Sequence, residues 1–81
     1  MKIKVLFFAQ IKEIFGEACR FVEVPEGSRV REVVEQLRRE SASPLFGEVP
    51  LLFAVNENFE SAEKKLSAGA DLAIMTPVSG G

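Results

Sequence analysis

Hydrophobic and polar side chains alternate at the start of the chain. Residues 2–9 read Lys-Ile-Lys-Val-Leu-Phe-Phe-Ala. Because successive side chains of a β-strand point to opposite faces, this pattern predicts a strand with one buried face. The residues of that face are Ile3, Val5 and Phe7. The two lysines mark the other face as exposed to solvent, and Leu6 and Phe8 fall on this exposed face.

A second, longer period appears in the middle of the chain. Apolar residues recur at the spacing i, i+3, i+4, i+7, which predicts one buried stripe on an amphipathic helix. They are Val30, Val33, Val34 and Leu37. Ser28 is the predicted N-cap of this helix, and the segment 41–44, Ser-Ala-Ser-Pro, ends it. The charged residues on the other side of the helix indicate a solvated surface.

Short segments bounded by turn residues account for the rest of the chain. The pattern predicts a short helix over 10–15, a strand over 18–24, an irregular segment over 45–50, a strand buried on both sides over 51–55, a short strand over 59–61 and a strand over 71–76. The last strand stops at Pro77, because proline fixes φ and cannot donate a hydrogen bond to a neighbouring strand.

The order of these elements predicts an α+β fold. One main helix covers one face of a mixed sheet of four to five strands, because this arrangement buries the apolar stripe. Eighty-one residues form one domain, predicted over 1–76 and followed by a flexible tail over 77–81. If the first and last strands are parallel neighbours, Phe8 and Met75 meet on the uncovered face. An apolar patch there predicts a docking surface for a partner.

Composition removes several classes of function. A net charge of −2 with mixed signs gives no basic surface for nucleic acid. No apolar run is long enough for a membrane span or a secretory signal, so we expect a cytoplasmic protein. The chain has no histidine and one cysteine, which excludes Ser-His and Cys-His nucleophile pairs and thiolate zinc sites. We therefore expect no metal site and no cofactor bound by the chain itself.

The single cysteine has two possible roles. Alternation places Cys19 on the same strand face as Phe21, which favours a small buried hydrophobic residue over a persulfide carrier. The chain has no histidine that could activate the thiol. We therefore expect Cys19 to be structural.

The last five residues, Pro77-Val78-Ser79-Gly80-Gly81, contain no charged side chain and little bulk. Fully extended, five residues reach about 17 Å, enough to enter a narrow channel in a partner. Gly80 and Gly81 lack a Cβ, so another molecule can approach the terminal carboxylate closely. A passive chain end is the alternative, because chain ends are commonly frayed and rich in small residues.

Three segments together resemble one family. Lys4-Val5-Leu6-Phe7-Phe8-Ala9-Gln10, Ala54-Val55-Asn56 and Pro77-Val78-Ser79-Gly80-Gly81 are similar to the MoaD family, the ubiquitin-like (β-grasp) small subunits of molybdopterin synthase. The resemblance implies that an E1-like, MoeB-like enzyme uses ATP to adenylate the carboxylate of Gly81. A sulfurtransferase supplies sulfur, which replaces AMP and leaves a thiocarboxylate.

The resemblance also implies the partner and the way it is bound. A MoaE-like large subunit would receive the tail residues Pro77, Val78, Ser79 and Gly80 in a channel. The thiocarboxylate would donate its sulfur to cyclic pyranopterin monophosphate, within a heterotetramer of two small and two large subunits. By matching positions, Phe8, Phe59 and Met75 would be docking residues, and Leu6 joins them because alternation places it on the exposed face.

Two other readings use the same terminus. A ubiquitin-like modifier would be conjugated to lysines of other proteins through Gly81. A ThiS-like carrier would deliver sulfur for the thiazole of thiamin, although the Phe-Phe-Ala strand argues against it. The sequence alone leaves these alternatives open.

Overall fold

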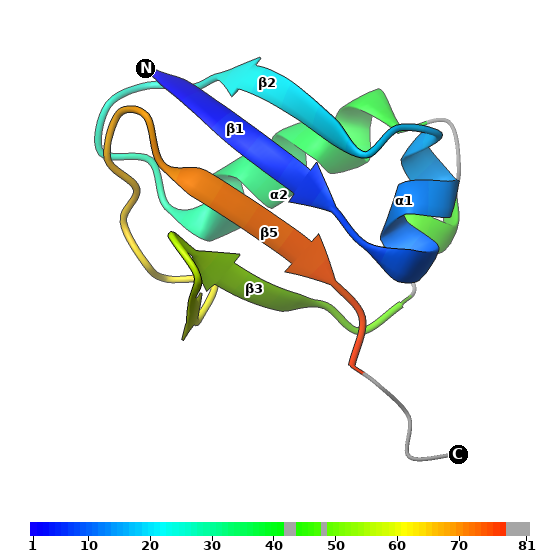
Figure 1. Cartoon of the computed structure of the whole chain (residues 1–81). Helices are drawn as coiled ribbons and strands as arrows, with labels where there is room; N and C mark the ends of the chain where they lie inside the picture. The colour runs from blue at the N-terminus through cyan, green and yellow to red at the C-terminus, as the bar shows by residue number, and fades with distance from the viewer. Residues whose placement is uncertain (42–43, 48, 78–81) are drawn as a thin grey trace.

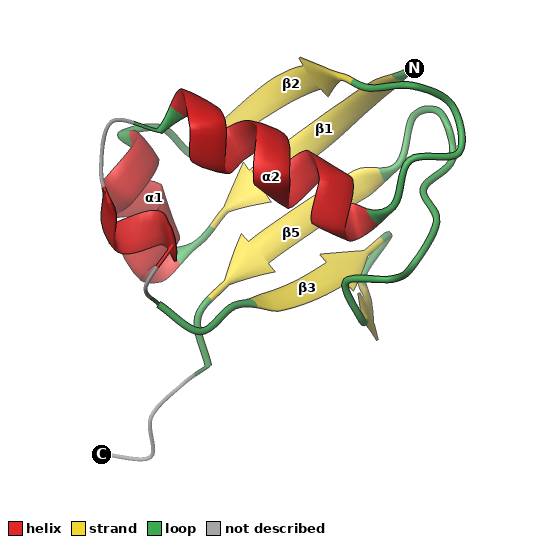
Figure 2. Ribbon diagram, turned by 180° about the vertical axis from the view of Figure 1, so that it is seen from behind, coloured by secondary structure: helices red, strands yellow, loops and turns green. Residues whose placement is uncertain are grey.

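One α-helix lies across one face of a twisted sheet in the computed structural model, which describes residues 1–41, 44–47 and 49–77 (Figures 1 and 2). The elements of the described residues are β1 (Lys2–Phe7), α1 (Ala9–Phe15), β2 (Cys19–Glu23), α2 (Val30–Glu40), a 3-10 helix η1 (Pro44–Gly47), β3 (Leu52–Val55), β4 (Asn58–Glu60) and β5 (Asp71–Met75). The predicted α+β class, with one main helix on a mixed sheet, is confirmed. Within the described ranges, no helix is long and apolar enough to cross a membrane.

The described strands form one sheet in the order β2-β1-β5-β3-β4. β1 and β5 are parallel, and Phe7 lies opposite Ile74. The β1–β2, β3–β5 and β3–β4 pairs are antiparallel. The condition considered for the first and last strands, that they are parallel neighbours, is therefore met, and both strands run toward the same end of the sheet (Figure 1).

The core lies between α2 and the face of the sheet that the helix covers (Figure 2). The predicted apolar stripe of α2 is buried, as are the alternate residues of β1 and β5. The members with no exposed surface are Ile3, Val5, Val30, Val33, Leu37, Leu72 and Ile74. Burial of each such side chain is worth about 1.5–3 kcal/mol, so this face holds the fold together.

The N-terminus of α2 differs from the prediction. The N-cap is Arg29, and the buried Ser28 hydroxyl donates instead to the carbonyl of Pro25, at 2.6 Å. One carboxylate oxygen of Glu32 accepts a hydrogen bond from the backbone N–H of Arg29, at 3.0 Å. Arginine has no acceptor, so only this half of a capping box can form. Ser28 therefore fixes the preceding turn and does not cap the helix.

The segment after α2 was predicted to be irregular, and this is wrong for its first part. Residues 44–47 form the 3-10 helix η1, and Phe46 is almost fully buried. Its ring meets Phe15 edge-on, with the ring centres 4.9 Å apart, and Phe15 stacks on Phe7 at 4.5 Å. A small aromatic cluster thus closes the core beside α1.

A two-residue turn joins β3 to β4. Asn56 and Glu57 have φ of 49° and 73°, the left-handed values that a tight hairpin needs. The side-chain oxygen of Asn56 accepts a hydrogen bond from the N–H of Asp71, at 3.0 Å. The hairpin is therefore held in place at the start of β5.

Candidate functional site

The face of the sheet that points away from α2 carries large apolar side chains in solvent. Among the described residues, four large hydrophobic side chains are exposed: Phe8 (47%), Phe21 (59%), Leu52 (39%) and Phe59 (72%). Strand register places Leu52 opposite Met75, and Phe59 opposite Ala54. The strand over 51–55 was expected to be buried on both sides. This is wrong at Leu52, because no second layer covers its face.

A band of these residues crosses the sheet where β1 and β5 end. Leu6 lies opposite Ala73, and the N–H of Phe8 donates to the carbonyl of Ile74, at 3.2 Å. The register therefore continues to bring Phe8 beside Met75, as predicted. We call Leu6, Phe8, Leu52, Phe59 and Met75 the apolar band.

Phe8 does not belong to β1, although the sequence predicted a strand up to residue 9. It is the N-cap of α1, and its carbonyl accepts hydrogen bonds from the N–H groups of Ile11 (3.0 Å) and Lys12 (3.3 Å). The chain turns at Ala9, whose φ is 49°. Since the backbone on both sides of Phe8 is bonded, the half-exposed ring is presented from a fixed position.

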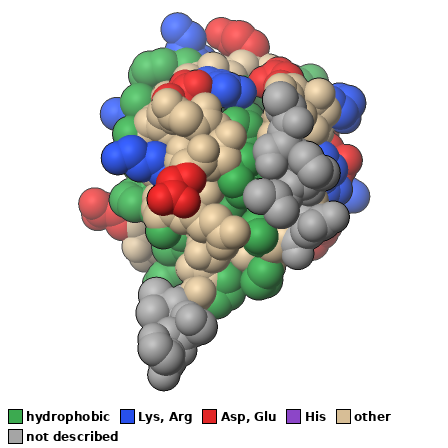
Figure 3. All heavy atoms as spheres, turned by 90° about the vertical axis from the view of Figure 1, so that its right-hand side faces the viewer, with side chains coloured by type: hydrophobic (Ala, Val, Ile, Leu, Met, Phe, Trp, Pro, Cys, Tyr) green, Lys and Arg blue, Asp and Glu red, His purple; other side chains and the backbone are tan. Residues whose placement is uncertain are grey.

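The opposite end of the open face is polar. Lys4 lies opposite Asp71, and Lys2 opposite Glu23. The Lys2 ammonium also lies over the Phe21 ring, 5.6 Å from its centre. The open face thus changes from charged to apolar in the direction in which β1 and β5 run. Hydrophobic side chains also reach the surface at the end of the molecule seen in Figure 3.

The end of β5 lies in this band, since Met75 belongs to it. β5 ends at Met75, and Pro77 is exposed. The predicted tail residues Val78, Ser79, Gly80 and Gly81 lie outside the described residues. Their roles, and the boundary between body and tail, stay predictions.

Cys19 contradicts its prediction. It shares a face with Phe21, as alternation required, but this is the open face, and Cys19 is exposed opposite Leu6. The buried face of β2 is formed instead by positions 20 and 22, where Val22 enters the core and Arg20 is partly covered. The apolar Val22 and Val24 were the sequence signal for this register.

The charged side chains of the described residues do not gather into a metal-binding cluster. No group of three or more His, Cys, Asp or Glu side chains among them could hold a metal ion. The pKa of Arg20 is raised, chiefly by the hydrogen bond that its guanidinium donates to Glu17. That guanidinium also lies 5.2 Å from the centre of the Phe15 ring, on the covered side of the sheet. Arg20 therefore belongs to the packing of the body.

Sequence reasoning missed Leu52 and Phe21 as surface residues. The run over 51–55 is almost wholly apolar, so alternation gave no sign of which face is open. Only the register with β5, which places Leu52 beside Met75, reveals its position.

Comparisons with known proteins agree with this geometry. The ThiS family model matches residues 5–81. The molybdopterin synthase sulfur carrier subunit of Chlamydomonas reinhardtii is 32% identical over 85 residues, covering 100% of both chains. A solved structure titled putative molybdopterin converting factor, subunit 1, from Pyrococcus furiosus aligns with a TM-score of 0.85 and 27% identity, covering 96% of this chain and 99% of that one.

A further solved structure contains two subunits. It is the complex of subunits 1 and 2 of molybdopterin-converting factor from Helicobacter pylori, whose matching chain aligns with a TM-score of 0.70 and 23% identity, over 100% of both chains. At this identity the likeness shows the fold alone. The ubiquitin-like β-grasp fold is confirmed. By its match over almost the whole chain, and by its full-length likeness to molybdopterin synthase sulfur carrier subunits, this chain belongs to the ThiS family.

Proposed function

We propose that this chain is the sulfur carrier subunit of a molybdopterin synthase. The observation that carries the proposal is the apolar band beside the exit of the C-terminal segment, in a chain related over its full length to such carriers. The band provides a surface for docking, and the terminus provides the group that reacts. The body then needs no catalytic side chain of its own.

The sulfur is loaded in two steps. A carboxylate is a poor electrophile, so an E1-like, MoeB-like enzyme transfers AMP from ATP to the carboxylate of Gly81 and releases pyrophosphate. Sulfide equivalents from a sulfurtransferase then attack the acyl-adenylate and expel AMP, which leaves a thiocarboxylate. The absence of a Cβ on Gly80 and Gly81 keeps the carbonyl open to attack. ATP belongs to the activating partner, and we place these steps in the cytoplasm.

The large, MoaE-like subunit consumes the sulfur. The apolar band docks on it, and the segment from Pro77 to Gly80 passes into its active site. The thiocarboxylate attacks cyclic pyranopterin monophosphate, and water later restores the carboxylate of Gly81. A dithiolene holds two sulfur atoms, so two loaded tails are used for each product. This stoichiometry suits a heterotetramer with two small and two large subunits.

The modifier and thiamin alternatives use the same chemistry at Gly81. The full-length relative is named as a molybdopterin synthase carrier, which favours sulfur transfer to the pterin over both. Conjugation would give adducts of higher mass on a denaturing gel that resist thiol reagents.

Intact-mass measurement tests the loading step. Protein produced with the activating enzyme and the sulfurtransferase should gain the mass difference between sulfur and oxygen at Gly81. Deletion of Gly81 should remove this gain without changing thermal stability. If the Gly81 deletion still supports formation of molybdopterin, the proposal is wrong.

A further inference from the structure

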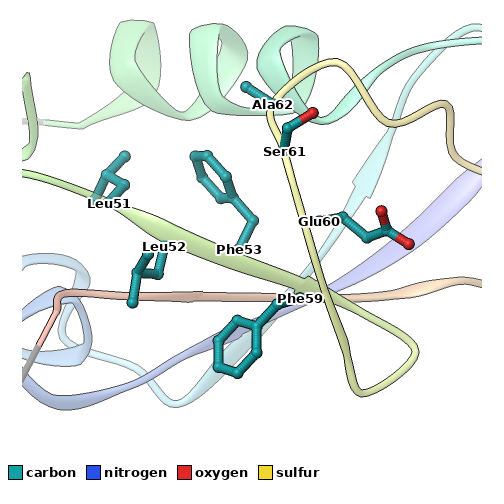
Figure 4. A pocket seen from close by; sticks show the side chains of 7 residues that line it. All are labelled: Leu51, Leu52, Phe53, Phe59, Glu60, Ser61 and Ala62. Carbon is teal, nitrogen blue, oxygen red and sulfur yellow. The ribbon is translucent and has the colours of Figure 1, made fainter.

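A hollow beside β3 continues from the open face of the sheet over the edge of the strand (Figure 4). Leu52 and Phe59 point to the open face. Leu51 and Phe53 point to the other side of β3, toward α2. The hollow therefore reaches both sides of the sheet at this edge. It extends beyond the apolar band, which lies on the open face only.

The hollow exists because β4 is shorter than β3. Their pairing stops where Phe53 lies opposite Glu60. The chain then turns to the start of α2, where the N–H of Arg31 donates to the carbonyl of Ala62, at 2.9 Å. None of the hydrogen bonds between described residues joins Leu51 to Ala62. The beginning of β3 is thus left as an uncovered strand edge.

We propose that an extended, apolar segment of the large subunit occupies this hollow. Its backbone pairs with the edge of β3 at Leu51, and one bulky apolar side chain lies beside Leu51 and Phe53, on the α2 side of the sheet. An added strand gains its affinity from main-chain hydrogen bonds and its specificity from such side-chain sites. This inference rests on the proposed function, because the same partner must dock on the apolar band.

Continuity with the apolar band selects this partner. Leu52 and Phe59 line the hollow and belong to the band. Leu52 also lies opposite Met75, at the end of the strand that leads to the C-terminal segment. A protein that covers the band and receives the tail therefore reaches the hollow without a gap. A side chain seated in a hollow at the margin of a flat face also fixes how the partner is oriented.

The lining restricts the chemistry of the segment. Most lining side chains are apolar, and Glu60 is the charged one among them. The Glu60 side chain is one-third exposed, and its carboxylate lies 3.6 Å from the ammonium of Lys64. An acidic segment would be repelled by Glu60, and a strongly basic one would compete with Lys64. A neutral, apolar segment fits best.

A pair of matched substitutions tests the proposal. Ala62→Leu fills the hollow, whereas Ala68→Leu adds the same bulk to an exposed turn outside it. We expect Ala62→Leu to weaken binding of the large subunit by about tenfold, which corresponds to about 1.4 kcal/mol, and Ala68→Leu to change it by less than about twofold. Thermal melts of both variants report whether the body remains folded.

Hydrogen exchange on the unmodified complex gives a second reading that needs no variant. When the large subunit is bound, the amide of Leu51 should exchange at about one-tenth of its rate in the free chain, or more slowly still. Unchanged exchange at Leu51, with equal binding by the two leucine variants, overturns the proposal. Protection of Leu51 in the isolated chain that grows with its concentration would instead identify a second copy as the occupant, and also overturns it.

The same experiments separate this inference from the proposed function. If the unmodified chain does not bind the large subunit, both are wrong. If the chain binds and Phe8→Asp abolishes binding while Ala62→Leu and Ala68→Leu behave alike, only the inference about the hollow is wrong.

Discussion

The two faces of one sheet are built from the same residue types but have different uses. On the face under α2, Val5, Leu72 and Ile74 have no exposed surface. On the open face, the exposed fractions of Phe59 and Phe8 are 72% and 47%. Exposed apolar side chains contribute little to the stability of the free body, because they stay in water. Their retention in an exposed band indicates a partner. Alternation therefore separates folding from docking, residue by residue, along each strand.

The largest effect on stability is expected on the covered face. Ile74→Ala removes a fully buried side chain and leaves a cavity between β5 and α2. We expect it to lower the free energy of unfolding by about 2–5 kcal/mol. Chemical denaturation of the variant and of the unmodified chain measures this. A loss below about 1 kcal/mol would mean that the covered face is not the stabilising one.

A substitution on the open face should have a large effect on binding and a small effect on stability. Phe8→Asp places a charge in the apolar band and should weaken binding of the large subunit by about 2–4 kcal/mol, the scale of an interface hot spot. The free energy of unfolding should change by less than about 1 kcal/mol, because the ring is half exposed. Calorimetric titration and denaturation of the same sample give both values. Unchanged affinity would remove Phe8 from the docking surface.

Most of the fold could be predicted from the sequence, because it follows from two periods. Residues 2–9 alternate with a period of two, and α2 carries an apolar stripe from Val30 to Leu37. The apolar side of the strand and this stripe pack against each other in the core. Pro77 predicted that the last strand ends at Thr76, and β5 ends one residue earlier, at Met75. These features depend on local geometry, which one sequence records fully.

The failures have a different cause, since each depends on contacts between distant segments. Cys19 was placed correctly on one face with Phe21 but expected to be buried, because apolar residues stand on both faces of β2 and the face of Val22 is the one that α2 covers. Phe46 is buried by its edge-on contact with Phe15, which in turn stacks on Phe7, and neither contact is visible in the sequence. Ser28 serves the turn at Pro25, which displaces the N-cap to Arg29. For the site, alternation gave Phe8, but Leu52 needed the register of β3.

An intermediate effect is expected at Arg20, which connects the covered face to α1. Its guanidinium donates to Glu17 at 2.9 Å and to Glu40 at 3.4 Å. Arg20→Met keeps the aliphatic stem and removes these ion pairs and the contact with Phe15, at an expected cost of about 0.5–1.5 kcal/mol.

The pKa of Arg20 sets the pH dependence of this cost. Its folded pKa is raised above the unfolded value by the hydrogen bond to Glu17, so its contribution is fully present below the unfolded pKa and is lost only as the pH rises through the folded one. Both lie far above the pH range in which the protein is handled. Denaturation at about pH 6 and pH 9 should therefore give the same cost for Arg20→Met. A cost that falls as the pH rises within that range would contradict this assignment.

The smallest effect is expected in the turn between β3 and β4. Glu57 has φ of 73° and is exposed, so Glu57→Gly relieves a left-handed backbone and should raise the free energy of unfolding by up to about 1 kcal/mol. Binding of the large subunit should not change, since Glu57 lies at the end of the sheet away from Met75. Thermal melts and titration check both. A destabilised variant would show that the Glu57 side chain holds the turn.

The central claim is that Gly81 delivers sulfur to a pterin held by a second subunit. Thiocarboxylated chain is mixed with the large subunit and cyclic pyranopterin monophosphate, and both the mass of the chain and the pterin product are followed in a single turnover. The account predicts that each chain returns to its carboxylate form as molybdopterin appears, with two chains used per product. A chain that keeps its sulfur while its complex with the large subunit is fully formed would contradict it.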